Sequence, residues 1–213
     1  MDGATTIGED RTRPDLRDAI LRASLELGSE LGEDGLTMRA IAARLGVSVT
    51  ALYHHFDGKP AILRALRFWG ADLLAAHLDP SYESEDPVEC LYRVSVRYVG
   101  FARDNPWLYR LLFAEQEVDW REFSPEERER LMAPNGQVQR CFVTAVERGS
   151  FRADLDVDTA PFIMWAANHG LASLILGGRI SETHPAFPVP SQDEFVHVFV
   201  SNFMRGFKNC PAP

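Results

Sequence analysis

The sequence predicts an all-α protein, in which a small N-terminal helical module precedes a larger helical domain. Apolar residues recur at the three- and four-residue spacing of amphipathic helices, and no convincing run of alternating residues predicts a strand. Glycines and prolines interrupt this pattern where connections between helices are expected. The chain has 213 residues, of which 46% are hydrophobic and 25% charged, as is ordinary for a globular protein. This length suffices for one sizeable core or for two domains.

The N-terminal module is predicted to begin with one long and two short helices. The first starts near residues 12–15, where threonine, proline and aspartate form a typical helix start, and ends at the glycines of 32–35. Its apolar positions have helical spacing: Leu16, Ile20, Ala23, Leu27 and Leu31. A short helix opened by Thr37 and another over about 49–56 then flank a tight turn at 46–48.

A longer helix over about 59–78 follows, with proline in its first turn, and an acidic linker over 79–87 comes after it. Further helices are predicted over about 88–103 and, as a shorter helix, after Asn105-Pro106. Another begins at the capping box at Ser124 and runs to about 148, with a kink near Pro134. The last two are predicted over 158–176 and over about 192–207. We therefore divide the chain into a disordered tail over 1–13, a helical module over 14–68 and a helical domain over 69–213.

The charges are distributed unevenly along the chain. The net charge is −9, which taken alone argues against binding to nucleic acid. Between Thr37 and Arg67, however, five basic residues stand against one acidic residue. A small basic patch on an acidic body is typical of a protein that meets DNA at one end only.

Several classes of protein are disfavoured by the sequence. No apolar run is long enough to cross a bilayer, and the first residues lack the apolar core of a signal peptide, so we expect a cytoplasmic protein without membrane contact. The three cysteines, Cys90, Cys141 and Cys210, are far apart, and we expect reduced packing thiols, with a redox sensor as the minor alternative. No catalytic signature, phosphate-binding glycine loop or metal pattern appears, so neither cofactor nor metal is expected.

The segment Leu36–Phe56 has the pattern of a helix-turn-helix. Its two short helices meet at Gly46, where the backbone is expected to need a positive φ angle, and Ser48 can cap the second helix. At about 100° per residue, the second helix turns its apolar side inward, at Val49, Leu52 and Phe56. Its outward side, with His55 on the flank, is formed by Thr50, Ala51, Tyr53 and His54. Such small and polar groups can enter a major groove.

The same segment resembles the DNA-binding domain of the tetracycline-repressor (TetR) family. The matching residues are Gly35–Thr37, Ile41–Ala42, Leu45–Ser48, Leu52–Phe56 and Lys59. The resemblance implies an all-α, dimeric transcription regulator, with a helix-turn-helix domain over 14–68 and a ligand-binding and dimerisation domain over 69–213. The resemblance and the outward face of the second short helix together give the candidate DNA-binding residues: Thr37, Arg39, Ser48, Val49, Thr50, Ala51, Tyr53, His54, His55 and Lys59. In the family, lysine or asparagine often precedes the lysine that matches Lys59, whereas this chain has Asp57-Gly58 there.

The C-terminal part carries a weaker resemblance. The segment Trp165–Leu171 is similar to a Trp-His-Gly signature of one subgroup, with Asn168 in place of the tryptophan before His169. The candidate ligand-binding residues are Phe101, Trp107, Tyr109, Phe142, Trp165 and His169, which could line a pocket for a largely apolar effector. The last two helices resemble the family's dimer-forming pair through their apolar faces: Ile163, Ala167, Leu171, Leu174, Phe195, Phe199 and Phe203.

The implied function is a ligand-responsive repressor that binds palindromic operator DNA as a homodimer and is released by a small molecule. Alternatives remain open at this point. His169 is more simply a hydrogen-bonded core histidine, and each aromatic residue is more simply part of the core. Adjacent imidazoles at His54 and His55 point about 100° apart on a helix, so they would chelate a metal poorly. An enzyme, such as a helical hydrolase or thiol oxidoreductase, would need a nucleophile and a base that we cannot assemble. A helical interaction module without DNA function is the other rival.

Overall fold

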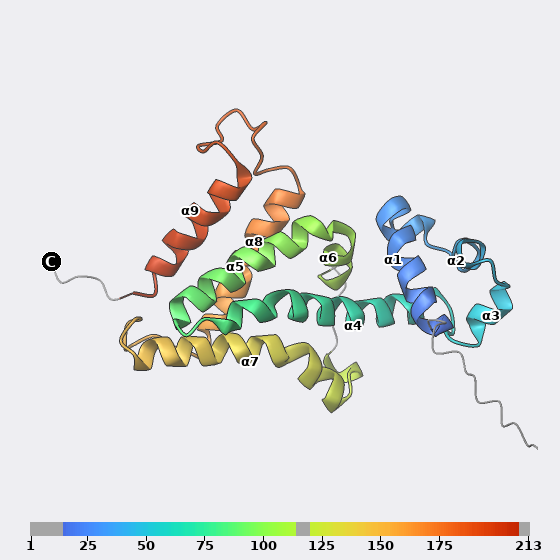
Figure 1. Cartoon of the computed structure of the whole chain (residues 1–213), viewed down its shortest axis with the longest axis horizontal. Coiled ribbons are helices and arrows are strands. Elements are labelled where there is room, and N and C mark those ends of the chain that lie inside the picture. The colour runs from blue at the N-terminus through green and yellow to red at the C-terminus, as the bar shows by residue number, and fades with distance from the viewer. Residues whose placement is uncertain (1–14, 114–119, 209–213) are drawn as a thin grey trace, which may run out of the picture. The chain divides into compact units, whose positions relative to one another are not determined.

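A computed structural model describes residues 15–113 and 120–208, so the predicted tail over 1–13 and Cys210 lie outside the described residues. The described chain folds into nine α-helices and two short 3-10 helices and contains no strand, which confirms the all-α prediction (Figure 1). No helix within these ranges combines the length and the apolar character that crossing a membrane requires. The chain divides into two compact units between Arg67 and Phe68.

The first unit contains α1 (Leu16–Gly35), α2 (Met38–Leu45), α3 (Val49–Tyr53) and the beginning of α4 (Lys59–Leu78). Its core consists of apolar side chains that are inaccessible to solvent: Ile20, Leu36, Ile41, Leu52, Ile62 and Leu66. The amphipathic spacing in the sequence places these side chains on the inner faces of the four helices, and their burial provides the main driving force for folding of this unit. The packing of α1 against α2, and of α2 against α3, fixes the position of the short α3.

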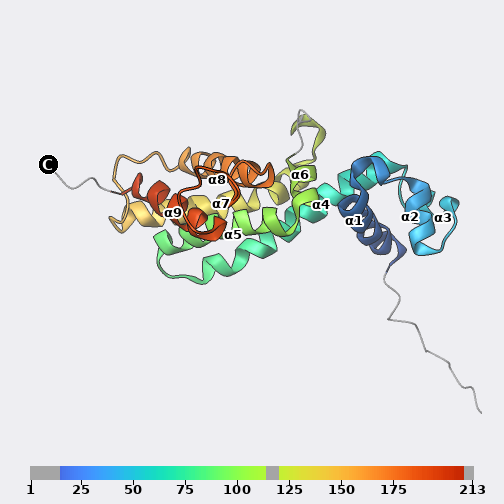
Figure 2. The same cartoon turned by 90° about the horizontal axis from the view of Figure 1, so that it is seen from above.

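The second unit contains the rest of α4 and the helices from η1 to α9. These elements are η1 (Asp79–Glu83), α5 (Pro87–Asp104), α6 (Pro106–Leu112), η2 (Trp120–Glu122), α7 (Pro125–Glu147), α8 (Ala160–Leu176) and α9 (Gln192–Arg205). Helix α5 is central, because it packs against α6, α7, α8 and α9 (Figures 1 and 2). Half of its residues are buried, so it forms the middle of the core.

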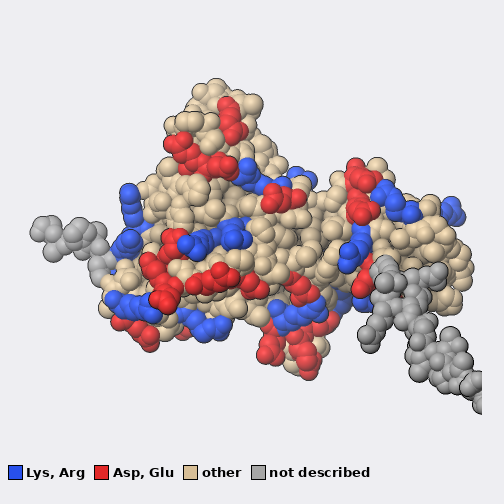
Figure 3. All heavy atoms as spheres, in the orientation of Figure 1, with Lys and Arg blue, Asp and Glu red and all other residues tan. Residues whose placement is uncertain are grey.

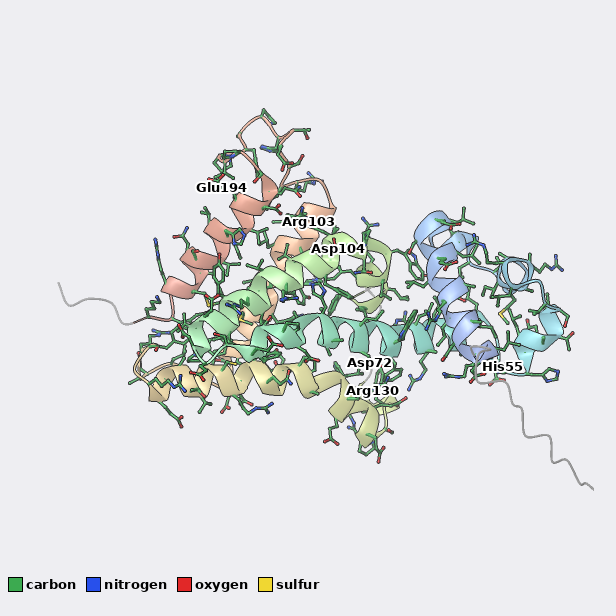
Figure 4. All side chains as sticks on the ribbon, in the orientation of Figure 1. His55, Asp72, Arg103, Asp104, Arg130 and Glu194 are labelled. Atoms are coloured by element: carbon green, nitrogen blue, oxygen red, sulfur yellow. The ribbon has the colours of Figure 1, made fainter. Side chains whose placement is uncertain are left out.

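Polar contacts tie neighbouring helices of this unit together. Asp72 of α4 and Arg130 of α7 face each other in Figure 4, and the guanidinium Nε donates to the carboxylate at 2.8 Å. The same guanidinium lies 5.8 Å from the ring centre of Phe68. Arg103 of α5 forms an ion pair with Asp193 of α9. These pairs are on the surface, where each contributes little stability but restricts how the helices can slide.

Several boundaries differ from the sequence prediction. Helix α1 ends at Gly35, within the predicted 32–35, and is broken at Gly32, whose φ of 73° and ψ of −176° are not helical. Helix α3 ends at Tyr53 rather than near Phe56. The segment 79–87 is not the predicted linker, because its residues 79–83 form η1, which packs against α5 and buries Ser81 completely. Helix α7 continues through Pro134, as predicted, and in Figure 1 its N-terminal part is inclined to the rest.

Candidate nucleic-acid interface and internal aromatic cluster

The turn between α2 and α3 is built from local backbone chemistry. Thr37 caps α2 by accepting a hydrogen bond from the amide of Ala40 at 3.1 Å. Gly46 ends α2 with a φ of 66°, a left-handed conformation that glycine adopts without steric cost. Ser48 then caps α3 by accepting from the amide of Ala51 at 3.1 Å. The predicted glycine turn and serine cap are therefore both confirmed, and they orient two short helices as a helix-turn-helix.

Helix α3 buries one face and exposes the other. Leu52 is completely buried and Phe56 nearly so, and the guanidinium of Arg17 on α1 covers the ring of Phe56 at 5.0 Å. On the opposite face, Thr50 and His54 are exposed, and 53% of Tyr53 is accessible. The outward face predicted from helical geometry is therefore confirmed for these three side chains. Val49, predicted to pack inward, is only half-buried.

All ten predicted DNA-binding residues lie in the first unit, and none is buried. Thr37 and Arg39 are exposed at the start of α2, while Lys59 is half-buried at the start of α4. His55 is half-buried and projects from the edge of the unit in Figure 4. The other members of the set, on or beside α3, are Ser48, Val49, Thr50, Ala51, Tyr53 and His54. The set thus gathers at α3 and at the beginnings of α2 and α4.

Acidic groups of α1 neutralise part of the basic patch. Arg44 of α2 donates to Glu30 at 2.6 Å and to Glu26 at 3.3 Å, and its hydrogen bond lowers the pKa of the Glu30 carboxyl. The ammonium of Lys59 donates to the backbone carbonyl of Glu33 at 2.6 Å and lies 3.8 Å from its carboxylate. Figure 3 shows acidic and basic groups interspersed on the visible face of α1 and α2. The excess of positive charge counted along the sequence is therefore smaller on the folded surface.

A cluster of rings occupies the second unit between α5, α6 and α8. We call this set the aromatic cluster, and its members are Tyr98, Tyr109, Phe113, Trp165 and His169. Neighbouring rings have centroids between 4.9 and 6.1 Å apart. Inside the cluster, the hydroxyls of Tyr98 and Tyr109 are 3.2 Å apart, and the hydroxyl of Tyr109 lies 2.6 Å from Nδ1 of His169. A chain of three polar groups therefore crosses an otherwise apolar site.

Burial keeps the polar groups of the aromatic cluster uncharged. It raises the pKa of Tyr98, raises the pKa of Tyr109 to about 12 and lowers the pKa of His169, because each charged form would lose its hydration. With neutral imidazole, the Tyr109 hydroxyl can donate to Nδ1. Beside it in sequence, Asn168 is buried and donates to the hydroxyl of Ser95 at 3.1 Å, while its carbonyl oxygen has no partner within the described chain. The site thus offers weak hydrogen-bonding groups and no formal charge.

Only part of the predicted ligand-binding set gathers in this cluster. Tyr109, Trp165 and His169 come together, whereas Phe101 is buried against His77 on α4. Phe142 is fully buried in a separate cluster with Phe151 and Phe207, so it does not reach the others. Trp107 is half-buried on α6.

Sequence reasoning missed one ring of the aromatic cluster and the burial of Asn168. Phe113 contacts both Tyr109 and His169, with centroids 4.9 and 5.2 Å away. Its spacing of four residues from Tyr109 was the available signal, because such pairs share one face of a helix. Asn168 departs from the Trp-His-Gly signature, and the fold shows that it is buried and bonded to Ser95.

Exposed apolar side chains follow the outer face of α8. Ile163 and Leu174 are 49% and 48% accessible, and Phe162 is also exposed, while Trp165 of the aromatic cluster remains 44% accessible. On α9, Val198 adds a further exposed apolar group. Leu171, which the sequence assigned to this outer face, is instead buried in the core of its own unit. Exposed large apolar side chains on the surface of a folded unit are candidates for association with another molecule.

Two family models match the chain. The model described as "Bacterial regulatory proteins, tetR family" matches residues 20–66. The model described as "Tetracyclin repressor-like, C-terminal domain" matches residues 91–200, which is more than half of the chain. The first match coincides with the helix-turn-helix unit, and the second includes α5 to α8, which carry the aromatic cluster.

Individual relatives match over shorter or more divergent stretches. The tetracycline repressor protein class C of Escherichia coli is 52% identical over 50 residues, which are 24% of this chain and 23% of that repressor. The nucleoid occlusion factor SlmA of Edwardsiella ictaluri is 31% identical over 106 residues, 49% of this chain and 54% of that factor. The chain thus spans about a quarter to a half of the length of these relatives.

Solved structures share the fold over nearly the whole chain. A Rhodococcus sp. RHA1 protein of unknown function has a TM-score of 0.78 at 24% identity, covering 95% of this chain and 100% of its own. The TetR family transcriptional regulator PfmR from Thermus thermophilus has a TM-score of 0.63 at 23% identity, covering 89% and 99%. At these identities the likeness concerns the fold alone.

Proposed function

The chain belongs to the TetR family of bacterial regulatory proteins, and from this premise we propose that it is a ligand-responsive repressor that binds a palindromic operator as a homodimer. The family is one of bacterial regulatory proteins, and the tetracycline repressor and PfmR named above are regulators and not enzymes. The observation that carries the proposal is the capped α3, which presents Thr50, Tyr53 and His54 to solvent at a glycine turn. We further propose the domain division at about residue 68 and action in the cytoplasm, where operator DNA is found.

In the proposed complex, α3 enters the major groove. Its exposed hydroxyls and imidazole can donate to or accept from base edges, while the amides at the beginnings of α2 and α4 approach phosphates. Arg39 is available for a phosphate, because it has no ion pair within the described chain. Lys59 would exchange its contact with Glu33 for a phosphate, at small cost because that contact is partly exposed to water. The remaining members of the predicted set would contact DNA from α3 and its flanks.

The proposed dimer forms through α8 and α9. Ile163 and Leu174 would bury their accessible surface against the same helices of a second copy, in the self-complementary manner of a twofold interface. Dimerisation fixes the distance between two α3 helices, which must match one turn of the DNA groove or a multiple of it. Replacing Leu174 with glutamate should therefore yield a monomer that has lost operator binding. Replacing Met132, an exposed apolar residue of α7, with glutamate is the matched control and should leave the dimer intact.

The proposed effector site is the aromatic cluster. Its rings suit a largely apolar small molecule, and the Tyr109–His169 pair can orient a polar group of that molecule. An effector that prefers a dimer with wrongly spaced α3 helices shifts the population away from DNA. To move that equilibrium from almost fully bound to almost fully released, its affinities for the two states must differ by about 5.5 kcal/mol.

The test is selection of operators from a randomised pool of double-stranded DNA by the purified full chain. We expect enrichment of palindromic sites whose half-sites lie one helical turn apart, or a multiple of it. Binding should weaken by roughly 10³–10⁵ between 50 and 200 mM salt if six to ten phosphates are contacted. A pool without enriched sequences, or affinity independent of salt, would overturn the proposal and favour an interaction module without DNA function.

A further inference from the structure

Two cysteines that are distant in the sequence meet in the second unit. Cys90 lies in the first turn of α5 and Cys141 lies on α7, and their Sγ atoms are 3.0 Å apart. Cys90 is buried, whereas Cys141 is half-buried and retains contact with solvent. The sequence favoured isolated packing thiols, because a separation of 51 positions gave no indication of contact. The fold instead creates a dithiol.

The dithiol lines a cavity of about 260 Å³. A water molecule occupies about 30 Å³ of liquid, so the cavity has room for hydrogen peroxide or a small organic hydroperoxide. Around the two sulfur atoms it is lined by Tyr82, Gln137, Arg140 and Thr144, which supply hydrogen-bonding groups. The hydroxyl of Tyr82 is buried and has no partner within the described chain, so it can bind a peroxide oxygen.

The two thiols differ in their readiness to ionise. The pKa of Cys90 is raised, chiefly by its hydrogen bond with Cys141 and also by burial. The same hydrogen bond lowers the pKa of Cys141, and the positive charge of Arg140 lowers it further. A thiolate is the nucleophilic form of cysteine, so Cys141 is the attacking group. Cys90 keeps its proton until a second step.

We propose that Cys90 and Cys141 form a reversible oxidation site that takes hydroperoxides as its substrate class and closes to a disulfide between α5 and α7. In the first step the Cys141 sulfur attacks a peroxide oxygen. An S–O bond forms, the O–O bond breaks, and the alkoxide or hydroxide that leaves takes up a proton from solvent. The product on Cys141 is a sulfenic acid.

In the second step Cys90 attacks the sulfur of the Cys141 sulfenic acid. An S–S bond forms, the S–O bond breaks, and hydroxide leaves as water with the proton of Cys90. Overall, two thiols are oxidised and one hydroperoxide is reduced to an alcohol, or to water from hydrogen peroxide, with release of one further water. The sulfur atoms must approach by about 1 Å to reach the usual S–S length of about 2.0 Å. A disulfide of this kind in a reducing compartment is transient, which fits a sensor of oxidants.

The experiment uses the full chain with Cys210→Ser, so that only the dithiol can react. After addition of one equivalent of hydrogen peroxide, we expect the intact mass to fall by two hydrogen atoms. Peptide mapping should recover Cys90 linked to Cys141, and dithiothreitol should reverse both changes. In this background, Cys90→Ser should stop at a Cys141 sulfenic acid that dimedone traps, whereas Cys141→Ser should remain unreacted. Two reduced thiols after excess peroxide, or dimedone labelling of Cys90 alone, would overturn the proposal.

Arginine variants test the assigned role of the positive charge. Arg140→Ala should slow disulfide formation several-fold near neutral pH, because removing this positive charge leaves less of Cys141 as the thiolate. Arg140→Lys should largely keep the rate, and Arg128→Ala, at another exposed arginine of α7, is the matched control. An unchanged rate in Arg140→Ala would overturn the assigned role of Arg140. The readout is chemical and needs no DNA, so this proposal can fail or succeed separately from the proposed function.

Discussion

The exposed face of α3 and the aromatic cluster are opposite solutions to placing polar groups for binding. On α3, the hydroxyls and imidazole of Thr50, Tyr53 and His54 stand in water on a helix of five residues. In the aromatic cluster, Tyr109 and His169 are brought together across 60 residues of sequence and bond to each other within a core of rings. The first surface can meet a large polyanion without reorganisation, whereas the second can receive only what displaces or rearranges packed groups.

This difference separates the expected effects of mutation. In the proposed complex, residues on the α3 face contribute to DNA affinity, and we expect them to contribute little to stability because their side chains are exposed. Residues of the aromatic cluster contribute to stability first, because removing one leaves its partners unpaired in a buried site.

The largest expected effect is on DNA affinity at Tyr53. Replacing Tyr53 with alanine should weaken operator binding roughly 10- to 100-fold, as expected for loss of a contact that contributes about 1–3 kcal/mol. The midpoint of thermal unfolding should stay nearly constant, since the side chain is half exposed. Leu31→Ala, at a comparably exposed side chain of α1, is the control and should leave affinity unchanged. Equal affinities of wild type and Tyr53→Ala in a gel-shift titration would remove α3 from the proposed interface.

Replacing Tyr109 with phenylalanine should have the reverse profile. The hydroxyl of Tyr98 and Nδ1 of His169 both lose their partner, which should cost about 1–3 kcal/mol and lower the unfolding midpoint by roughly 2–10 °C. Operator affinity measured well below that midpoint should not change. Tyr92→Phe removes an exposed hydrogen bond to His197 and should cost less than about 0.5 kcal/mol. Equal stability losses in the two variants, by scanning calorimetry, would show that burial of the aromatic cluster is energetically unimportant.

When DNA is present, Lys59 can either keep its contact with Glu33 or bind a phosphate. If it releases Glu33 and binds a phosphate, Lys59→Ala should lower the slope of log affinity against log salt by about one unit. Arg44→Gln should leave the slope unchanged, because that guanidinium is already neutralised by Glu26 and Glu30. Identical slopes for wild type and Lys59→Ala would mean that Lys59 keeps its contact with Glu33 at the end of α1 and binds no phosphate.

The same two regions differ in how much of their structure could be predicted from the sequence. The helix-turn-helix was predictable because its determinants are local: caps at Thr37 and Ser48, a left-handed glycine at 46 and an inward Leu52. The aromatic cluster was predictable only in part, because helix packing, and not spacing, decides whether Phe142 or Phe113 joins His169. For the same reason the dithiol could not be foreseen. Segment 79–87 was misread because its charged composition hid the burial of Ser81.

The smallest expected effect is the dependence of stability on pH at His169. Burial lowers the pKa of this imidazole below its ordinary value of 6.5, so below about pH 6.5 the unfolded chain binds the proton more readily than the folded chain. Stability that is fully present above pH 6.5 should therefore be lost as the pH falls toward the folded pKa. His169→Gln removes the titrating imidazole, so the unfolding midpoint of the variant should decline less between pH 7.0 and 5.0 than the midpoint of wild type. Parallel declines would mean that the imidazole becomes charged within the fold, and that the aromatic cluster is as accessible to water as the face of α3.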